Sequence, residues 1–164
     1  MQNKKTLFLT QAATIAALYV VLTLFTNAFG LANYSIQVRF SEALTILPLF
    51  TPAAIPGLYV GCLLSNIITG CIAWDILLGP VATLLGAIGT YLLRTNTQKW
   101  PATLPPIFAN TLIVPFILSY AYQFEGSIPY FMITIGIGEI ISCGFLGMLV
   151  YFTLAKHAKH LFPR

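Results

Sequence analysis

The sequence predicts an all-α integral membrane protein, a compact bundle of six transmembrane helices with both termini in the cytoplasm. The chain has 164 residues, of which 58% are hydrophobic and 7% are charged, whereas a soluble domain carries roughly 25% charged residues. The apolar residues form long uncharged runs, and the basic residues gather in alternate connections between them. The lipid bilayer is therefore the expected solvent of a single domain covering residues 1–164.

The first two runs predict three helices. Thr6 to Phe29 is uncharged and long enough to cross a hydrocarbon core of about 30 Å. Phe40 to Cys71 is interrupted by three prolines and divides near Pro52, because the residue before a proline resists helical geometry. A re-entrant hairpin is the alternative for this run, and it would leave every later loop on the same side of the membrane as two full crossings do. Two full crossings are preferred, since irregular backbone exposed to lipid is costly.

The last three runs predict one helix each. The fourth helix begins at Asp75, the fifth starts with prolines at positions that a helix tolerates, and Pro115 is expected to bend it. The sixth is interrupted only by Glu139. The expected helices cover residues 6–29, 40–51, 56–71, 75–93, 104–122 and 128–155.

The basic residues fix the predicted orientation. With a cytoplasmic N-terminus, every lysine and arginine except Arg39 falls on the cytoplasmic side, as the positive-inside rule requires. These residues flank the helices and do not form one basic face. The net charge of +4 therefore gives no reason to expect nucleic acid as a partner.

Several motifs of catalysis and cofactor binding are missing from the sequence. It has no Gly-rich phosphate loop, no His-Glu metal signature, and its two histidines lie in the basic tail, far from the acids. The three cysteines are odd in number and lie in apolar segments, which favours small buried side chains over a disulfide or metal site. We therefore expect neither an enzyme nor a cofactor or metal in this chain.

The four acidic residues are the most informative polar groups. Glu42 and Asp75 are predicted near the outer ends of their helices, and Glu125 in a solvated outer turn. Glu139 lies about 15 Å beyond the start of its helix, near the bilayer midplane, where an unpaired carboxylate is costly. Each has a structural alternative: Glu139 a packing hydrogen bond, Glu42 an ion pair with Arg39 three residues away, and Asp75 a helix cap.

Other polar and aromatic residues extend the candidate ligand-binding set. Arg39 belongs to this set beside its acidic neighbour Glu42, and Asn66 and Asn110 either form hydrogen bonds between helices or contact a ligand. Five aromatic residues fall at the predicted outer boundary, where they form an aromatic belt or stack on a flat ligand: Trp74, Tyr34, Tyr120, Tyr122 and Tyr130.

Small residues recur at helical spacing in two helices. The first helix contains two overlapping Ala-xxx-Ala pairs and the third contains Gly-xxx-Gly, patterns that allow close approach of membrane helices. The residues are Ala12, Ala13, Ala16, Ala17, Gly57 and Gly61.

Several segments of the sequence resemble those of one protein family. The most distinctive are Ile36–Thr45, Leu47–Pro48 and Phe50–Leu58. Further blocks are Gly61–Cys62, Ser65–Asn66, Trp74–Ile76, Leu104–Pro106, Asn110–Val114 and Gly138–Cys143. Together they resemble the queuosine-precursor transporter family (QueT) over most of the chain.

The resemblance implies the substrate-binding S-component of an energy-coupling factor (ECF) transporter in a bacterial cell membrane. Such a subunit works with a transmembrane coupling subunit and two cytoplasmic ATPases, which use the ATP. The alanine pairs resemble the motif that meets the coupling subunit, with two registers left open. The implied substrate is a 7-deazaguanine such as 7-aminomethyl-7-deazaguanine.

A division of roles among the candidate residues follows from the chemistry of this substrate. Glu139 is expected to bind the guanine-like edge, because a buried carboxylate most needs paired donors, and Glu42 or Asp75 would bind the aminomethyl cation. A proton-coupled secondary transporter of a nucleobase-like or vitamin-like solute, with Glu139 as proton relay, and a purely structural subunit are the alternatives.

Overall fold

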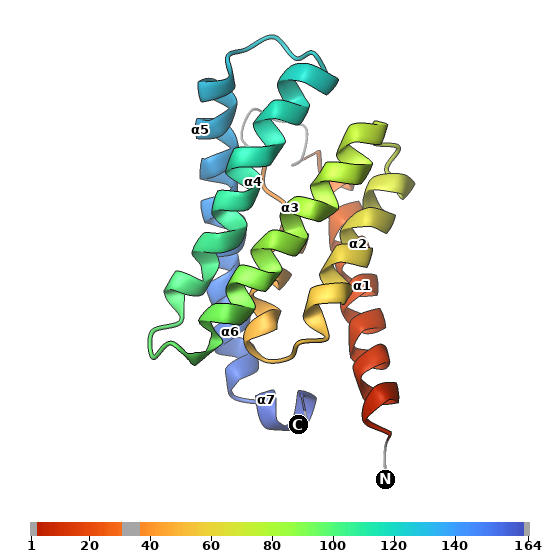
Figure 1. Cartoon of the computed structure of the whole chain (residues 1–164), viewed down its shortest axis with the longest axis vertical. Helices are drawn as coiled ribbons and strands as arrows, with labels where there is room; N and C mark the ends of the chain where they lie inside the picture. Colours follow the sequence, from red (N-terminus) through yellow and green to blue (C-terminus); the bar gives the residue numbers. More distant parts are fainter. Residues whose placement is uncertain (1–2, 31–36, 163–164) are drawn as a thin grey trace.

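The structure, a computed structural model, describes residues 3–30 and 37–162 and is helical (Figure 1). No β-strand occurs within these two ranges. The elements join into six rods, which confirms the predicted helical bundle. The rods are α1 (Lys4–Ala28); η1 (Phe40–Leu49); α2 (Ala54–Ile68); α3 (Ala73–Leu92) with η2 (Leu93–Thr95); η3 (Trp100–Thr103), α4 (Leu104–Phe116) and η4 (Ile117–Ala121); and α5 (Ile128–Glu139), η5 (Ile140–Leu146) and α6 (Gly147–Ala155). A short helix, α7 (Ala158–Leu161), follows.

Four rods are long and apolar enough to cross a membrane. They cover Lys4–Ala28, Ala73–Thr95, Trp100–Ala121 and Ile128–Ala155. Large apolar side chains point outward along them, including Leu9, which is 66% exposed, and Phe145, which is 71% exposed. A soluble protein rarely leaves so much apolar surface uncovered, whereas lipid solvates it.

The second rod differs from the predicted full crossing. The division near Pro52 is found, but the segment before it is a 3₁₀ helix of ten residues, about 20 Å long at 2.0 Å per residue. The fifteen residues of α2 give about 22 Å, so neither rod alone spans a 30 Å core. The chain enters η1 through an extended segment, with Arg39 in β geometry.

The 3₁₀ helix η1 lies in the centre of the bundle. All residues from Ser41 to Pro48 are buried, and the rod contacts α1, α3, α6 and η5. Pro48 cannot donate an α-helical hydrogen bond, and the Thr45 hydroxyl donates to the Glu42 carbonyl at 2.6 Å. These features tighten the local backbone, and η1 ends at Leu49.

The first and third rods pack closely through small residues. A Cβ added to Gly57 would lie 2.7 Å from the Ala12 carbonyl oxygen, and one added to Gly61 would lie 3.0 Å from that of Ala16. The Gly-xxx-Gly pair of α2 therefore packs against one alanine register of α1. Ala13 and Ala17, in the other register, are exposed.

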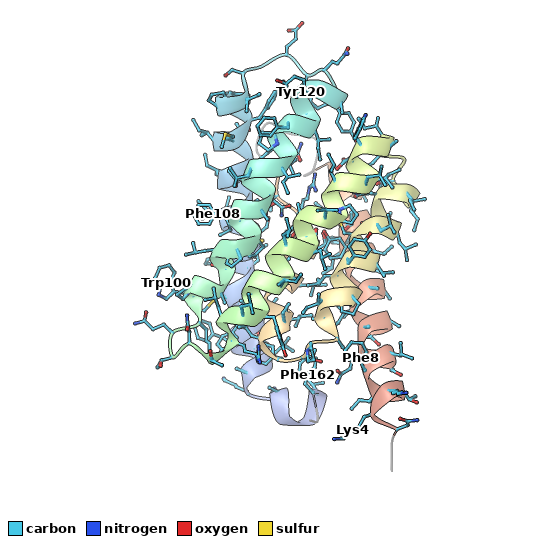
Figure 2. The ribbon with its side chains drawn as sticks, viewed as in Figure 1. Lys4, Phe8, Trp100, Phe108, Tyr120 and Phe162 are labelled. Atoms are coloured by element: carbon cyan, nitrogen blue, oxygen red, sulfur yellow. The ribbon has the colours of Figure 1, made fainter. Side chains whose placement is uncertain are left out.

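Basic residues gather at one end of the bundle. Lys4, Arg94 and Phe162 line a common cavity there, and the Lys99 amine donates to the Arg94 carbonyl. In Figure 2, Lys4 and Phe162 lie at the end opposite Tyr120. This arrangement agrees with the predicted orientation, and the cytoplasmic location of this end stays a prediction.

Candidate functional site

A cavity of about 710 Å³ opens in the half of the bundle away from α7. All six rods and the chain leading into η1 contribute to its lining, so residues far apart in the sequence meet there. Its lining is Tyr19, Thr23, Thr26, Asn27, Gln37, Arg39, Ser41, Ser65, Asn66, Thr69, Gly70, Cys71, Asp75, Leu118, Tyr122, Phe124, Glu125, Tyr130, Phe131 and Thr134. This volume is in the range of small-molecule sites.

The cavity follows from the short second rod. Because η1 begins part-way along the bundle, none of the described helices fills the centre between η1 and the end away from α7. Hydrogen bonds fix its entry: the Arg39 N–H donates to the Ser142 hydroxyl at 3.0 Å, and the Phe40 N–H donates to the Thr26 hydroxyl at 3.2 Å. A Cβ at Gly138 would collide with the Gln37 carbonyl, so glycine permits this approach.

One wall carries a carboxylate held by two neighbours. Asp75, 7% exposed, accepts a hydrogen bond from the Tyr122 hydroxyl to Oδ2 at 3.1 Å. Its backbone carbonyl accepts from the Asn66 amide at 3.0 Å. Burial and the nearby Asp75 carboxylate raise the pKa of Tyr122 above its ordinary value, so the phenol remains a donor. Asp75 is thereby presented to the cavity in a fixed position.

The part of the lining at the start of η1 carries a guanidinium group, from Arg39, and a hydroxyl group, from Ser41. Arg39 donates from Nη2 to the Gln37 side chain at 3.1 Å, and the other N–H donors of its guanidinium form no hydrogen bond to a described side chain. The Ser41 side chain is 1% exposed, and its hydroxyl has no hydrogen-bond partner among the residues that the structure describes. A buried polar group without a partner is rare in proteins and marks a place where a ligand or water completes the bonding.

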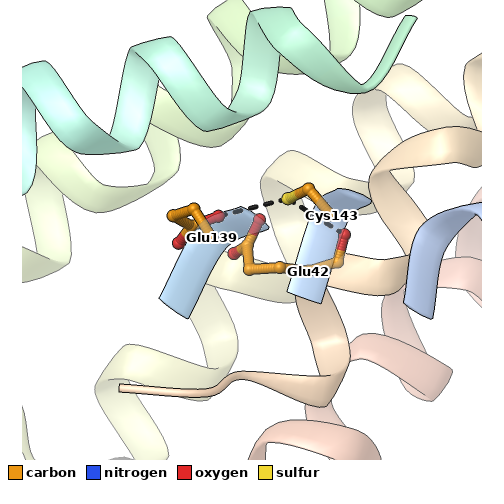
Figure 3. Close-up of side chains that lie close together, drawn as sticks. All are labelled: Glu42, Glu139 and Cys143. Atoms are coloured by element: carbon orange, nitrogen blue, oxygen red, sulfur yellow. Dashed lines mark hydrogen bonds between the residues drawn. The ribbon is translucent and has the colours of Figure 1, made fainter. Parts of the chain in front are cut away.

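Two acidic side chains lie in a buried cluster beneath the cavity. Glu42 is held by the Tyr19 hydroxyl and by the Asn110 amide at 3.4 Å, while the Cys143 thiol donates to Glu139 at 3.1 Å (Figure 3). Glu139 ends α5 just before the π-helical turns of η5, which carry Cys143. The carboxylate of Glu42 thus accepts from Tyr19 and Asn110, and the structure, which describes both residues, shows no ion pair between Glu42 and Arg39, which was one of the two alternatives for Glu42.

The cluster also has donors of the kind that bind metals. One potential ligand atom from each of Glu42, Glu139 and Cys143 lies within 4.8 Å of the others. Each side chain already takes part in hydrogen bonds, which are sufficient to explain the grouping. The expectation of no metal site stays a prediction.

The predicted site residues fall into three groups. Arg39, Asn66 and Asp75 line the cavity, whereas Glu42, Asn110 and Glu139 are buried but do not contribute to its lining. The boundary aromatics Trp74 and Tyr120 belong to neither of these groups. Trp74 is 61% exposed and Tyr120 is 72% exposed, and neither lines the cavity. Tyr34 lies outside the described residues.

Sequence reasoning missed several lining residues. Tyr122 and Tyr130 were expected only as boundary aromatics, in a belt or stacked on a ligand, but Tyr122 contacts Asp75 and both line the cavity. Tyr19 was not among the predicted residues. It lies one helical turn after Ile15, on the buried face of α1, and a hydroxyl on such a face of an apolar helix indicates a buried polar contact. Ser41 gave no signal, because its orphan hydroxyl emerges only from packing.

Comparison with known proteins supplies the family. The family model described as QueT transporter matches residues 9–156. A curated relative from Lactococcus lactis subsp. cremoris (strain MG1363), named queuosine precursor transporter QueT, is 27% identical over 166 aligned positions, covering 95% of this chain and 96% of the relative. No solved structure matches this chain.

Proposed function

The chain belongs to the QueT transporter family, and we propose that it is the S-component of an ECF importer for a queuosine precursor, a 7-deazaguanine. The observation that carries this proposal is the polar cavity inside an apolar helical bundle, with Asp75 and Arg39 in one lining. The relative's name supports the substrate class, because the similarity covers nearly the whole of both chains.

The cavity offers groups complementary to a 7-deazaguanine. We assign the aminomethyl cation to Asp75, since this carboxylate lines the cavity and Tyr122 fixes its position. Arg39 and Ser41 provide donors for the carbonyl oxygen and ring nitrogen of the base. Phe131, 7% exposed, provides an aromatic surface.

The role assigned to Glu139 changes accordingly. The sequence suggested a direct bond from Glu139 to the guanine-like edge, but its place below the lining favours an indirect role. Together with Glu42 it forms a buried, hydrogen-bonded acidic pair under the cavity, which supports the lining from below.

The packing of α1 supports a choice between the two alanine registers. Ala12 and Ala16 meet the glycines of α2, so they are used within the bundle. Ala13 and Ala17 are exposed and leave a shallow strip on α1. We propose that this strip meets the transmembrane coupling subunit, whose two ATPases would supply the energy for transport.

A proton-coupled carrier is the second candidate. The buried pair Glu42 and Glu139 favours it, since intramembrane carboxylates often form proton relays. In that mechanism the chain would transport alone, and Glu139 would gain and lose a proton in each cycle.

One experiment separates the two mechanisms. The purified chain alone should bind 7-aminomethyl-7-deazaguanine in calorimetry, and proteoliposomes should accumulate it only when the coupling subunit and the ATPases are present and ATP is enclosed in the lumen with the ATPases. Accumulation should survive collapse of the proton gradient. Uptake by the chain alone that an uncoupler abolishes would instead establish the proton-coupled carrier.

A further inference from the structure

A second cavity, of about 400 Å³, lies at the basic end of the bundle. It is formed by the start of α1, the connection from η1 to α2, the end of α3 and Phe162. Its lining is Lys4, Leu7, Phe8, Gln11, Pro48, Leu49, Phe50, Thr51, Pro52, Tyr91, Arg94 and Phe162. None of these residues has a role in the site described above.

The chemistry of this lining is that of an amphiphile site. Leu7, Phe8, Leu49 and Phe50 give it hydrocarbon walls, and the charged residues of the described lining are both basic. The polar pair Gln11 and Thr51 is satisfied internally, because the Thr51 hydroxyl donates to Gln11 at 2.8 Å. The described lining therefore combines two basic side chains with apolar surface.

The positive groups are arranged to receive an anion. The Arg94 guanidinium lies 3.8 Å over the Tyr91 ring and donates one N–H to the Tyr91 carbonyl at 3.1 Å, which orients its remaining donors. Lys4 begins the 25-residue helix α1, whose first turn contains no acid. The positive end of that helix adds to the two side-chain charges.

The position in the bilayer selects the kind of anion. The long apolar helix α1 starts at Lys4, so the cavity lies where the hydrocarbon core meets the headgroups. Basic pockets between helices at this level bind anionic phospholipid headgroups. We propose that this cavity binds an anionic phospholipid, with its phosphate between Lys4 and Arg94 and an acyl chain along Leu7 and Phe50.

Native mass spectrometry of the detergent-purified full chain tests this proposal. Wild-type protein titrated with phosphatidylglycerol should bind it at least tenfold more tightly than phosphatidylcholine. Lys4→Gln and Arg94→Gln should each weaken phosphatidylglycerol binding about fivefold, the value expected for one basic residue beside an anionic headgroup. Lys156→Gln, which removes an exposed basic residue outside the lining, should change it little.

Other outcomes of these measurements would contradict the phospholipid proposal. Equal affinity for the two lipids, or an equal effect of Lys156→Gln, would show that no built site exists. Competition by millimolar inorganic phosphate alone would indicate a simple anion site and overturn the lipid assignment. Unchanged lipid binding in Lys4→Gln and Arg94→Gln, with loss of assembly with the coupling subunits, would assign the cavity to a protein partner. Elution volume and thermal midpoint without added lipid verify the fold of each variant.

Discussion

At the scale of single residues, Asp75 combines three properties that the other acids lack together. It is buried, it lines the cavity, and a fixed phenol donates to it. Glu42 and Glu139 are buried beneath the lining, and Glu125 is exposed at its edge. If the cavity binds an aminomethyl deazaguanine, Asp75 is therefore the carboxylate placed to pair with its cation.

Asp75→Asn should weaken binding of the aminomethyl compound by about 2 kcal/mol, roughly thirtyfold in Kd, because a charge-assisted bond is lost. The neutral 7-cyano analogue should lose much less. Titration calorimetry with both ligands measures the difference, and Glu125→Gln is the matched control with little expected effect. Equal losses for the two ligands would mean that Asp75 acts by shaping the cavity rather than by pairing.

Ser41→Ala separates ligand contact from folding. The hydroxyl has no partner in the described contacts, so its removal should leave the thermal midpoint unchanged or raised. Ligand affinity should fall by about 1 kcal/mol, the value of one hydrogen bond.

Ser65→Ala is the matched control for Ser41→Ala. The Ser65 hydroxyl also lines the cavity but donates to the Cys62 carbonyl at 2.9 Å, so its loss should lower stability more than Ser41→Ala does. Thermal unfolding and ligand titration on both variants decide the matter. Unchanged affinity in Ser41→Ala would show that water, and not the ligand, satisfies this hydroxyl.

At the scale of elements, η1 shows what the sequence could and could not predict. Its start, its burial and the break near Pro52 follow from apolar runs and prolines. Its 3₁₀ geometry does not, because α and 3₁₀ helices share the same apolar pattern over ten residues, and tertiary packing on every side decides between them.

The candidate site was predicted only in part for the same reason. Asp75, Arg39 and Asn66 were found because polar groups in apolar runs are conspicuous. Depth alone left Trp74 and Tyr120 open as belt residues or ligand contacts, and both are exposed and do not line the cavity. Depth along a helix is readable from sequence, whereas the direction of a side chain depends on how each helix is rotated against its neighbours.

The two alanine registers of α1 should respond differently to enlargement. Ala13→Leu and Ala17→Leu place bulk on an exposed strip, so they should abolish uptake in reconstituted complexes while ligand binding by the isolated chain stays within about twofold. Ala16→Leu should lower the thermal midpoint, because its neighbour Gly61 leaves no space.

Uptake and binding assays on the same preparations test this difference. Normal uptake by Ala13→Leu and Ala17→Leu would place the coupling subunit on another face of the bundle. Equal losses of stability in both registers would show that all four alanines pack internally.

At the scale of the whole molecule, the two ends differ in charge and in accessibility. Lys4 and Arg94 share a cavity at one end, whereas the 710 Å³ cavity, the proposed ligand site, reaches Glu125 at the other. The positive-inside rule then predicts that the proposed ligand site faces the exterior, as the proposed import function requires. The three cysteines provide a means of testing this orientation, because Cys62 and Cys143 are buried and Cys71 lines the ligand cavity.

A membrane-impermeant maleimide applied to intact cells should therefore modify native Cys71, and a bound deazaguanine should protect it. In a Cys71→Ser background, Glu125→Cys should react from outside, while Thr97→Cys, in the connection after α3, should react only after the cells are opened. Mass-shift labelling on gels measures all three. Reaction of Thr97→Cys in intact cells would invert the orientation, and Cys71 labelling that saturating ligand leaves unchanged would separate the binding site from this cavity. Protection of Cys71 with the expected sidedness would show that the ligand binds in the cavity next to the short second rod. It would also show that the ligand reaches this cavity from outside, as import requires.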